Sequence, residues 1–310
     1  MSDHPDLLKP LVDYFEGPRP MDWDAVFGRR APLHVEIGSG MGEMLFKNAT
    51  AHPDINFIGV EQIWERIYRT FKRIHNHGVN PLGNVKILQA DVRDGLERLF
   101  IPESIDAMYC LFPCPWPKKS HIKHRLFSND FLRLANDRLK LGAMLKVVTD
   151  FEPYCGWIKE ESKNTGFDVD TRKVFTEYDT KFERKWKSGG QTEFFEINCV
   201  KRKNASVFVK KDVLLKAYKA KNFDIDRFKF SDVTGEVSVV FKDVLFDERK
   251  QVALVHVVVA EGHLAQHVRV AVAKKDSSWL IKISDGQKFF PTPGISKAIE
   301  CVYKSIVATC

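Results

Sequence analysis

The stretch from Leu33 to Glu43, LHVEIGSGMGE, decides how this chain folds. Its first five residues have the character of a short strand, and three glycines follow with one residue between each pair. Glycine tolerates positive φ angles and lets a backbone come close to a ligand, so Gly38, Gly40 and Gly42 predict a tight turn. A helix is expected over residues 41–50. A strand, a glycine turn and a helix in this order begin an open α/β sheet.

Short apolar runs continue to alternate with helix-period segments downstream of this turn, which predicts parallel strands joined by crossover helices. The further strands are expected at INFIGVE, VKILQAD, SIDAMYCLF and AMLKVVTD, with two more near FDVDTRKVF and QTEFFEINCV. The further helices are expected over residues 63–77, 130–140 and 152–164. The predicted fold class is therefore α/β, with a mostly parallel sheet that is covered on both faces.

The alternation stops at the basic segment VKRKN, residues 200–204, where a linker is expected. A short helix over 212–221 is predicted next, then alternating strands at GEVSVVFK, VALVHVVVAE, HVRVAVAK and WLIKIS, and a closing helix from about 294 to 308. VALVHVVVA is apolar on both faces and predicts an interior strand. The predicted organisation is an N-terminal extension (1–30), an α/β domain (31–203) and a smaller α+β domain (205–310).

Composition bounds the function only loosely. The 310 residues are 44% hydrophobic and 29% charged, and the net charge of +7 favours an anionic partner weakly. The α+β domain holds 17 Lys and Arg against 12 Asp and Glu, so it is expected either to grip RNA or to serve packing or dimerisation. The chain shows neither a secretory signal nor a run of about 18 apolar residues, and its six cysteines are scattered. We expect a cytoplasmic protein with reduced thiols and no membrane partner.

Three acidic residues follow or end the first three predicted strands, namely Glu36, Glu61 and Asp91. Carboxyl ends of parallel strands share one edge of a sheet, so these side chains are expected to gather beside the glycine turn. A dinucleotide fingerprint would require glycine at 43, where this chain has Glu43. Carboxylates would repel a pyrophosphate but suit an ammonium, ribose hydroxyls and an adenine amine. The acids and the three glycines therefore predict a site for S-adenosylmethionine; the alternative is a tight turn beside solvated acids.

The segment from Leu111 to Arg125, LFPCPWPKKSHIKHR, resembles the FPDPWxKxxHxKRR signature of the bacterial tRNA (guanine-N7)-methyltransferase family. HVEIGSGMGE, FIGVE, QAD, VVTDFEPY and DTKFERKWKSGG resemble further motifs of that family, and together they cover about residues 20–202. The resemblance implies a class I methyltransferase with a Rossmann-like, doubly wound sheet of seven strands in the order 3-2-1-4-5-7-6. It also implies S-adenosylmethionine as the methyl donor and guanine 46 in the tRNA variable loop as the target.

The same resemblance assigns site residues. It implies substrate contacts at Lys118, Asp150 and the run Thr180, Lys181, Phe182 and Glu183. It places the family's catalytic aspartate at position 114, near the cofactor, where this chain has Cys114.

Guanine N7 carries a lone pair and no proton, so its methylation needs alignment more than a base. A carboxylate beside the purine would stabilise the developing positive charge, whereas a thiol is mostly neutral at pH 7 and a weak acceptor. The rival interpretation is therefore a tRNA-binding relative that keeps the cofactor site but has little activity.

Three other roles for Cys114 stay open at this point. Lys118, Lys119 and His121 could favour a thiolate. Pro113-Cys114 is similar to the nucleophilic Pro-Cys pair of cytosine-C5 methyltransferases. Cys110, Cys114, His121 and His124 could hold zinc, although the His-x2-His spacing is tight and Cys110 lies in an apolar strand, so no metal is expected.

The basic run Lys118, Lys119, Lys123 and Arg125 is expected to meet tRNA phosphates. In the family signature, KRR follows the histidine, where this chain has Lys123, His124 and Arg125.

Overall fold

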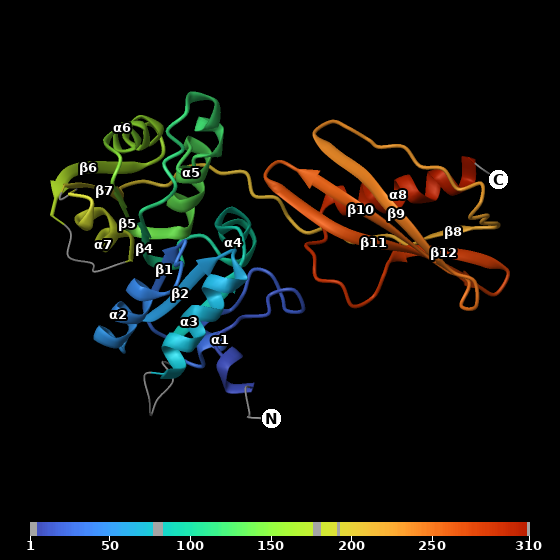
Figure 1. Ribbon diagram of the computed structural model, residues 1–310, viewed down its shortest axis with the longest axis horizontal. Helices are drawn as coiled ribbons and strands as arrows, with labels where there is room; N and C mark the ends of the chain where they lie inside the picture. Colours follow the sequence, from blue (N-terminus) through green and yellow to red (C-terminus); the bar gives the residue numbers. More distant parts are fainter. Residues whose placement is uncertain (1–4, 77–82, 176–180, 191–192, 309–310) are drawn as a thin grey trace. The chain divides into compact units, whose positions relative to one another are not determined.

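The computed structural model describes residues 5–76, 83–175, 181–190 and 193–308. Two compact units make up the chain, unit 1 (Met1–Val209) and unit 2 (Lys210–Cys310), and each is described by itself (Figure 1).

Unit 1 is built on a seven-stranded sheet in the order β3-β2-β1-β4-β5-β7-β6, which confirms the predicted order. All neighbouring strands are parallel except β7, which is antiparallel to both β5 and β6. The strands are β1 (Leu33–Ile37), β2 (Asn56–Glu61), β3 (Val85–Gln89), β4 (Ile105–Leu111), β5 (Leu139–Thr149), β6 (Phe167–Val174) and β7 (Phe194–Lys201). The carboxyl ends of β1 to β5 therefore lie at one edge of the sheet.

Helices connect these strands, by crossovers where the successive strands are parallel. The longer ones are α2 (Glu43–Ala51), α3 (Trp64–Asn76), α4 (Val92–Leu99), α5 (Asn129–Arg138), α6 (Glu152–Glu161) and α7 (Lys181–Ser188); α1 (Trp23–Phe27) and the 3-10 turns η1 (Pro5–Leu8) and η2 (Lys119–His124) are short. Strand order reverses between β1 and β4, so right-handed crossovers place α2 and α3 on one face and α4 to α6 on the other. The sheet is thus doubly wound (Figure 1).

In helix α3, the spacing of apolar residues predicts the buried face correctly except at the N-terminal end. Ile67, Phe71 and Ile74 are buried against the sheet, as the i, i+4 and i+3 spacing predicts. Ile63 continues the same spacing toward the N-terminus but is 46% exposed, because it precedes the first helical residue, Trp64.

The N-terminal extension packs along β3, which is an edge strand of the sheet. Val12 donates its N–H to the carbonyl of Ile87 at 3.0 Å, and Ile87 donates to Pro10 at 2.7 Å. Tyr14 donates its hydroxyl to the Gln89 carbonyl at 2.6 Å, and burial raises the pKa of Tyr14 to about 12. The extension therefore satisfies polar backbone groups that an edge strand would otherwise expose.

Unit 2 is a five-stranded antiparallel sheet in the order β8-β12-β11-β10-β9, with one helix against it. Its elements are β8 (Tyr218–Ala220), β9 (Val237–Asp247), β10 (Val252–Glu261), β11 (Leu264–Lys275), β12 (Ser278–Ile283) and α8 (Pro293–Ala308). Val255, Val257 and Val259 of β10 share a core with Ile295 and Ile299 of α8. This arrangement confirms the predicted α+β class of the second domain.

The structure corrects three expectations at the junction and beyond. The helix predicted over 212–221 is wrong, because residues 218–220 pair with β12 as strand β8 and their neighbour Leu215 packs on the core. The predicted linker starts too early, because Lys201 ends β7 with its side chain buried and its Nζ bonded to the Leu139 carbonyl at 2.8 Å. The interior position of β10 is confirmed, but only alternate residues are fully buried, so one of its faces is partly open.

None of the helices in the described ranges has the length and apolar character needed to cross a membrane.

Candidate active site

The glycine turn after β1 adopts the conformation that its composition predicts. Gly38, Gly40 and Gly42 have φ of 68°, 55° and 68°, all in the left-handed region. The N–H groups of Gly38 and Ser39 donate to the Val60 carbonyl at 2.9 and 3.1 Å, so the turn is fixed to β2. A Cβ built on Gly38 would meet no atom within 4 Å, so the backbone faces open space there. The turn thus leaves room for a ligand at its start.

At its other end the turn is tightly packed, which gives a test of its geometry. A Cβ on Gly42 would lie 2.4 Å from Cγ2 of Thr70, so Gly42→Ala combines a left-handed backbone with a steric clash. We expect it to lower the free energy of unfolding by about 2–4 kcal/mol in urea titrations.

Gly38→Ala is the matched control, because it has the same φ and no clash. It should cost only about 1–2 kcal/mol. Equal losses for the two variants would show that packing against Thr70 does not constrain the turn.

Glu61 ends β2 and ties the turn to the following helix. Its Oε2 accepts the N–H of Gly40 at 3.1 Å, and its Oε1 accepts the N–H groups of Gln62 and Ile63, each at 2.9 Å. Arg66, whose side chain is 48% exposed, approaches Oε2 at 3.5 Å. The carboxylate is 6% exposed, so three backbone donors hold a negative charge in a fixed position at the sheet edge.

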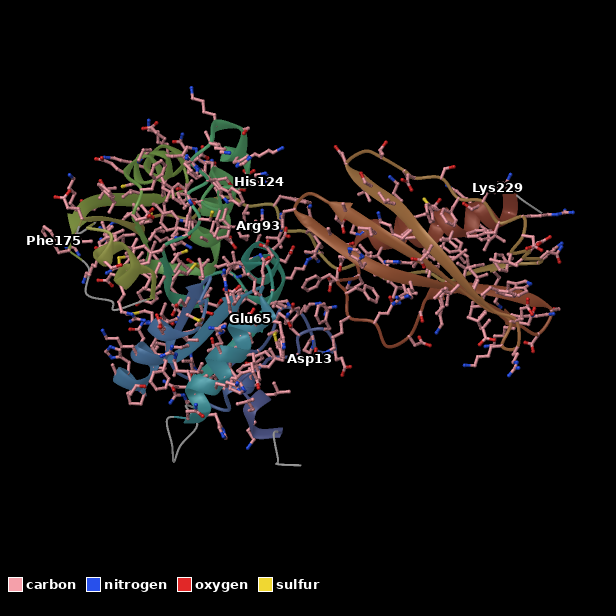
Figure 2. The ribbon with its side chains drawn as sticks, in the orientation of Figure 1. Asp13, Glu65, Arg93, His124, Phe175 and Lys229 are labelled. Carbon is pink, nitrogen blue, oxygen red and sulfur yellow. The ribbon has the colours of Figure 1, made fainter. Side chains whose placement is uncertain are left out.

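Asp91 lies beyond β3 at the start of α4 and is joined to the same region. It caps α4 by accepting the N–H of Arg93 at 2.9 Å, and its Oδ2 accepts from the Gln62 side chain at 3.0 Å. The Arg93 guanidinium pairs with it at 2.6 Å; Arg93 is labelled in Figure 2. Gln62 follows Glu61 directly in the chain, so its hydrogen bond joins the end of β2 to Asp91. The sequence analysis did not predict a role for Gln62.

Glu36 differs from the other two acids because the part of the chain that the structure describes offers its carboxylate no compensating partner. It is 7% exposed on β1, and among the described residues no hydrogen bond or ion pair reaches its carboxylate. Desolvation raises the pKa of Glu36 to about 8. A buried carboxyl of this kind becomes favourable as an anion once a cation lies beside it.

The loop after β4, which contains the Pro-Cys-Pro-Trp-Pro segment, has two residues other than glycine with positive φ. Phe112 and Trp116 have φ of 55° and 45°. Phe112 donates its N–H to the Val148 carbonyl of β5 at 2.7 Å, so the segment starts at the sheet edge. Cys114 is exposed between these two residues, whereas Cys110 is buried within β4 and 3% exposed. This separation of Cys110 from the loop gives no support to the zinc alternative.

The basic run after this loop divides into two kinds of residue. Lys118, Lys119, Lys123 and His124 are exposed on or beside η2, where Figure 2 labels His124. Arg125 is buried and 8% exposed. The expectation that Arg125 meets phosphate is therefore wrong for this structure, because its guanidinium is turned inward onto protein groups.

The remaining predicted substrate residues lie on β5 and α7. Asp150 follows β5, is half-buried, and desolvation raises its pKa. Helix α7 is tied to α2 through Arg184 and Glu43 at 3.0 Å, a contact that the sequence analysis missed. Glu183 is fully buried and pairs with Lys187 at 2.8 Å. Thr180 lies outside the described residues, as do the side chains of Lys181 and Phe182.

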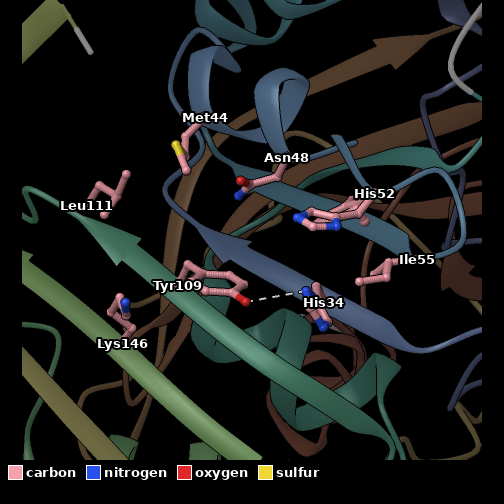
Figure 3. A pocket seen from close by; sticks show the side chains of 9 residues that line it. His34, Met44, Asn48, His52, Ile55, Tyr109, Leu111 and Lys146 are labelled. Carbon is pink, nitrogen blue, oxygen red and sulfur yellow. Dashed lines mark hydrogen bonds between the residues drawn. The ribbon is translucent and has the colours of Figure 1, made fainter. Parts of the chain in front are cut away.

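A separate hollow of about 280 Å³ lies between α2 and the sheet (Figure 3). It is lined by His34, Met44, Asn48, His52, Ile55, Phe57, Tyr109, Leu111 and Lys146. Inside it His34 Nδ1 lies 3.4 Å from the Tyr109 hydroxyl, and burial lowers the pKa of His34. The three candidate acids do not line this hollow, so it is distinct from the predicted cofactor site.

A doubly wound sheet in this order, with a glycine turn after β1 and acids at or near the carboxyl ends of β1 to β3, defines a class I S-adenosylmethionine-dependent methyltransferase. A family model described as "Putative methyltransferase" matches residues 30–196. The tRNA (guanine-N(7)-)-methyltransferase of Chlorobium phaeobacteroides is 41% identical over 165 residues, which are 53% of this chain and 79% of that protein. The chain belongs to the tRNA (guanine-N7)-methyltransferase family.

Two further relatives carry the same printed name. The protein of Nitrosomonas europaea is 38% identical over 179 residues, which are 56% of this chain and 78% of the relative. The protein of Thermotoga maritima is 28% identical over 304 residues, which are 93% of this chain and 94% of the relative. Similarity to the latter therefore extends through unit 2.

Proposed function

We propose that this chain transfers the methyl group of S-adenosylmethionine to N7 of a guanine in tRNA, at position 46 of the variable loop. The single observation that carries the proposal is that three acids, Glu36, Glu61 and Asp91, lie at or near the carboxyl ends of β1, β2 and β3, beside a glycine turn that faces open space. The identification of guanine N7 as the methylated atom and of tRNA as the substrate follows from membership of the family.

The residues present fit this cofactor. Glu61 would accept hydrogen bonds from the ribose hydroxyls, and the exposed Arg66 side chain near Oε2 would move aside. Asp91 would face the adenine amine. The buried Glu36 would meet the ammonium of the methionine end, which gives its carboxylate the cation it lacks among the described residues. The cofactor supplies an electrophilic methyl on a sulfonium.

The protein's part in the transfer is to bind and align. Guanine N7 needs no deprotonation, so holding the base in line with the methyl is the main contribution, and such alignment supplies up to about 7–11 kcal/mol. Cys114 occupies the position where the family pattern has an acid, at the exposed tip of the loop after β4. Asp150, which follows the neighbouring strand β5, would also contact the substrate. Lys118, Lys119 and Lys123 would meet tRNA phosphates.

Binding of the cofactor is expected to release a proton from Glu36. Burial raises the pKa of this carboxyl to about 8, whereas an ammonium neighbour favours its ionised form. Affinity for S-adenosylmethionine should therefore rise about tenfold per pH unit between pH 6 and 7 and level off near pH 8. Calorimetry in buffers of different ionisation enthalpy would measure both the affinity and the proton release. Glu36→Gln should bind weakly and without this slope.

The cofactor-free protein provides an independent check on the same pKa. A carboxyl with a raised pKa contributes stability that is present below its unfolded value of 4.5 and is lost as pH rises through 8. The Tm of Glu36→Gln relative to the natural protein should therefore increase from pH 5 to pH 8. A pH-independent difference would contradict a buried, unpaired Glu36.

The function is tested with purified protein, labelled S-adenosylmethionine and unmodified tRNA. Methylated guanine is detected by borohydride and aniline cleavage, which is expected at the variable loop. Absence of cleavage at high protein concentration, with tRNA binding retained, would favour a binding protein that has lost efficient transfer.

A further inference from the structure

Arg125 closes the basic segment but is buried instead of solvated. Its Nε donates to the Pro115 carbonyl at 2.9 Å, and its Nη2 donates to the Trp116 carbonyl at 3.4 Å. The residue is 8% exposed. A planar guanidinium with several donors suits two neighbouring carbonyls, which a lysine ammonium cannot engage in the same way.

The same guanidinium packs on two aromatic rings of α6. Its central carbon lies 5.2 Å from the Tyr154 ring centroid and 5.1 Å from that of Trp157. The two rings stack on each other at 5.6 Å with an interplanar angle of 27°. Cation–π attraction over an aromatic face is stronger for a desolvated guanidinium than for an exposed one. Arg125 therefore joins the loop after β4 to the helix after β5.

The loop that Arg125 holds is one that requires external support. Phe112 and Trp116 have positive φ, a conformation that is unfavourable for a residue other than glycine and persists only where surrounding contacts enforce it. The carbonyl groups that Arg125 binds belong to the two residues after Cys114. The position of residue 114 thus depends on Arg125, whose guanidinium is turned onto groups of the protein itself.

We propose that Arg125 is a positioning residue for methyl transfer. It fixes the backbone on the C-terminal side of Cys114 against Tyr154 and Trp157, and it does not contact tRNA phosphate. The inference rests on the proposed function only in its assumption that residue 114 lies beside the substrate. The clamp, meaning the contacts of Arg125 with the carbonyl groups of Pro115 and Trp116 and with the rings of Tyr154 and Trp157, is defined within the protein.

The test compares Arg125→Lys with Lys123→Ala, which removes an exposed cation of η2 close by in the sequence. A displacement of catalytic groups by about 1 Å can cost 10²-fold, so we expect Arg125→Lys to lower kcat about 10–100-fold. Its KM for tRNA should stay within about twofold. The slope of log K against log salt for tRNA binding should be unchanged in Arg125→Lys but smaller by about 0.7–0.9 in Lys123→Ala.

A second measurement does not depend on activity. Amide hydrogen exchange of the peptide spanning residues 111–126 should become at least about tenfold faster in Arg125→Lys, because the clamp restrains local opening. This readout stays informative even if the natural protein transfers no methyl group. If Arg125→Lys does not fold, Trp157→Leu removes one aromatic face and should shift exchange and kcat in the same direction by less. Unchanged exchange, or a salt slope reduced as in Lys123→Ala, would overturn the inference.

Discussion

Replacing Glu61 by glutamine is expected to weaken binding of S-adenosylmethionine about 10²–10³-fold. The carboxylate is held by three backbone N–H groups and presents its charge at the sheet edge. Hydrogen bonds to a charged acceptor contribute about 1.5–3 kcal/mol each, so weakening two bonds to ribose hydroxyls has an effect of this size. Calorimetric titration of the purified variant measures it directly.

Two variants separate this effect from damage to the fold. Glu65→Gln, on α3 four residues after Glu61, changes an exposed acid paired only with Arg69 in the described contacts, and it should bind normally. Asp91→Asn keeps a good N-cap for α4 while losing the charge, so about tenfold weaker binding is expected with little loss of stability. Normal binding by Glu61→Gln would remove Glu61 from the cofactor site.

Cys114→Asp is expected to raise kcat about 10²–10³-fold with the affinity for S-adenosylmethionine within about twofold. The methylated purine is cationic, and one preorganised electrostatic partner commonly contributes this factor. Cys114 is exposed, so an aspartate can be accommodated without repacking. Single-turnover assays with saturating tRNA would isolate the transfer step.

Neutral replacements at the same position identify what the thiol does. Cys114→Asn supplies the shape of aspartate without its charge and should gain little. Cys114→Ser should stay within about threefold of the natural protein if the sulfur is neither a thiolate nor a covalent nucleophile. Complete loss in Cys114→Ser would support the nucleophilic alternative, and no gain in Cys114→Asp would move the electrostatic role to another acid such as Asp150.

The sheet of unit 1 could be predicted because its signals are local. Short apolar runs indicated the strands, and the helical spacing between these runs indicated the helices. The three glycines from Gly38 to Gly42 predicted a turn with positive φ, and all three have it. That Glu36, Glu61 and Asp91 lie near one another could be predicted for a related reason, since residues at carboxyl ends of parallel strands must share an edge. Their electrostatic differences could not, because Glu36 is desolvated and Glu61 is held by backbone donors only in the folded chain.

The misplaced elements are those whose conformation depends on distant partners. Residues 212–221 have helix-forming composition, yet residues 218–220 are extended because β12 offers them strand pairing. The N-terminal extension has no strong pattern of its own, and its course follows from the exposed edge of β3. Tertiary pairing outweighs weak local propensity in both cases.

By itself the amino-acid sequence determined the strands and helices of a mostly parallel sheet covered on both faces, the glycine turn, and the edge at which the three acids gather, because periodicity and turn chemistry act over a few residues. Only the tertiary structure decided which of the basic side chains are exposed to solvent and which are buried. Lys118 and Lys123 stay exposed, whereas Arg125 in the same segment is buried against Tyr154 and Trp157. The physical reason is that burial of a charge depends on donors, acceptors and rings that folding brings together from other parts of the chain.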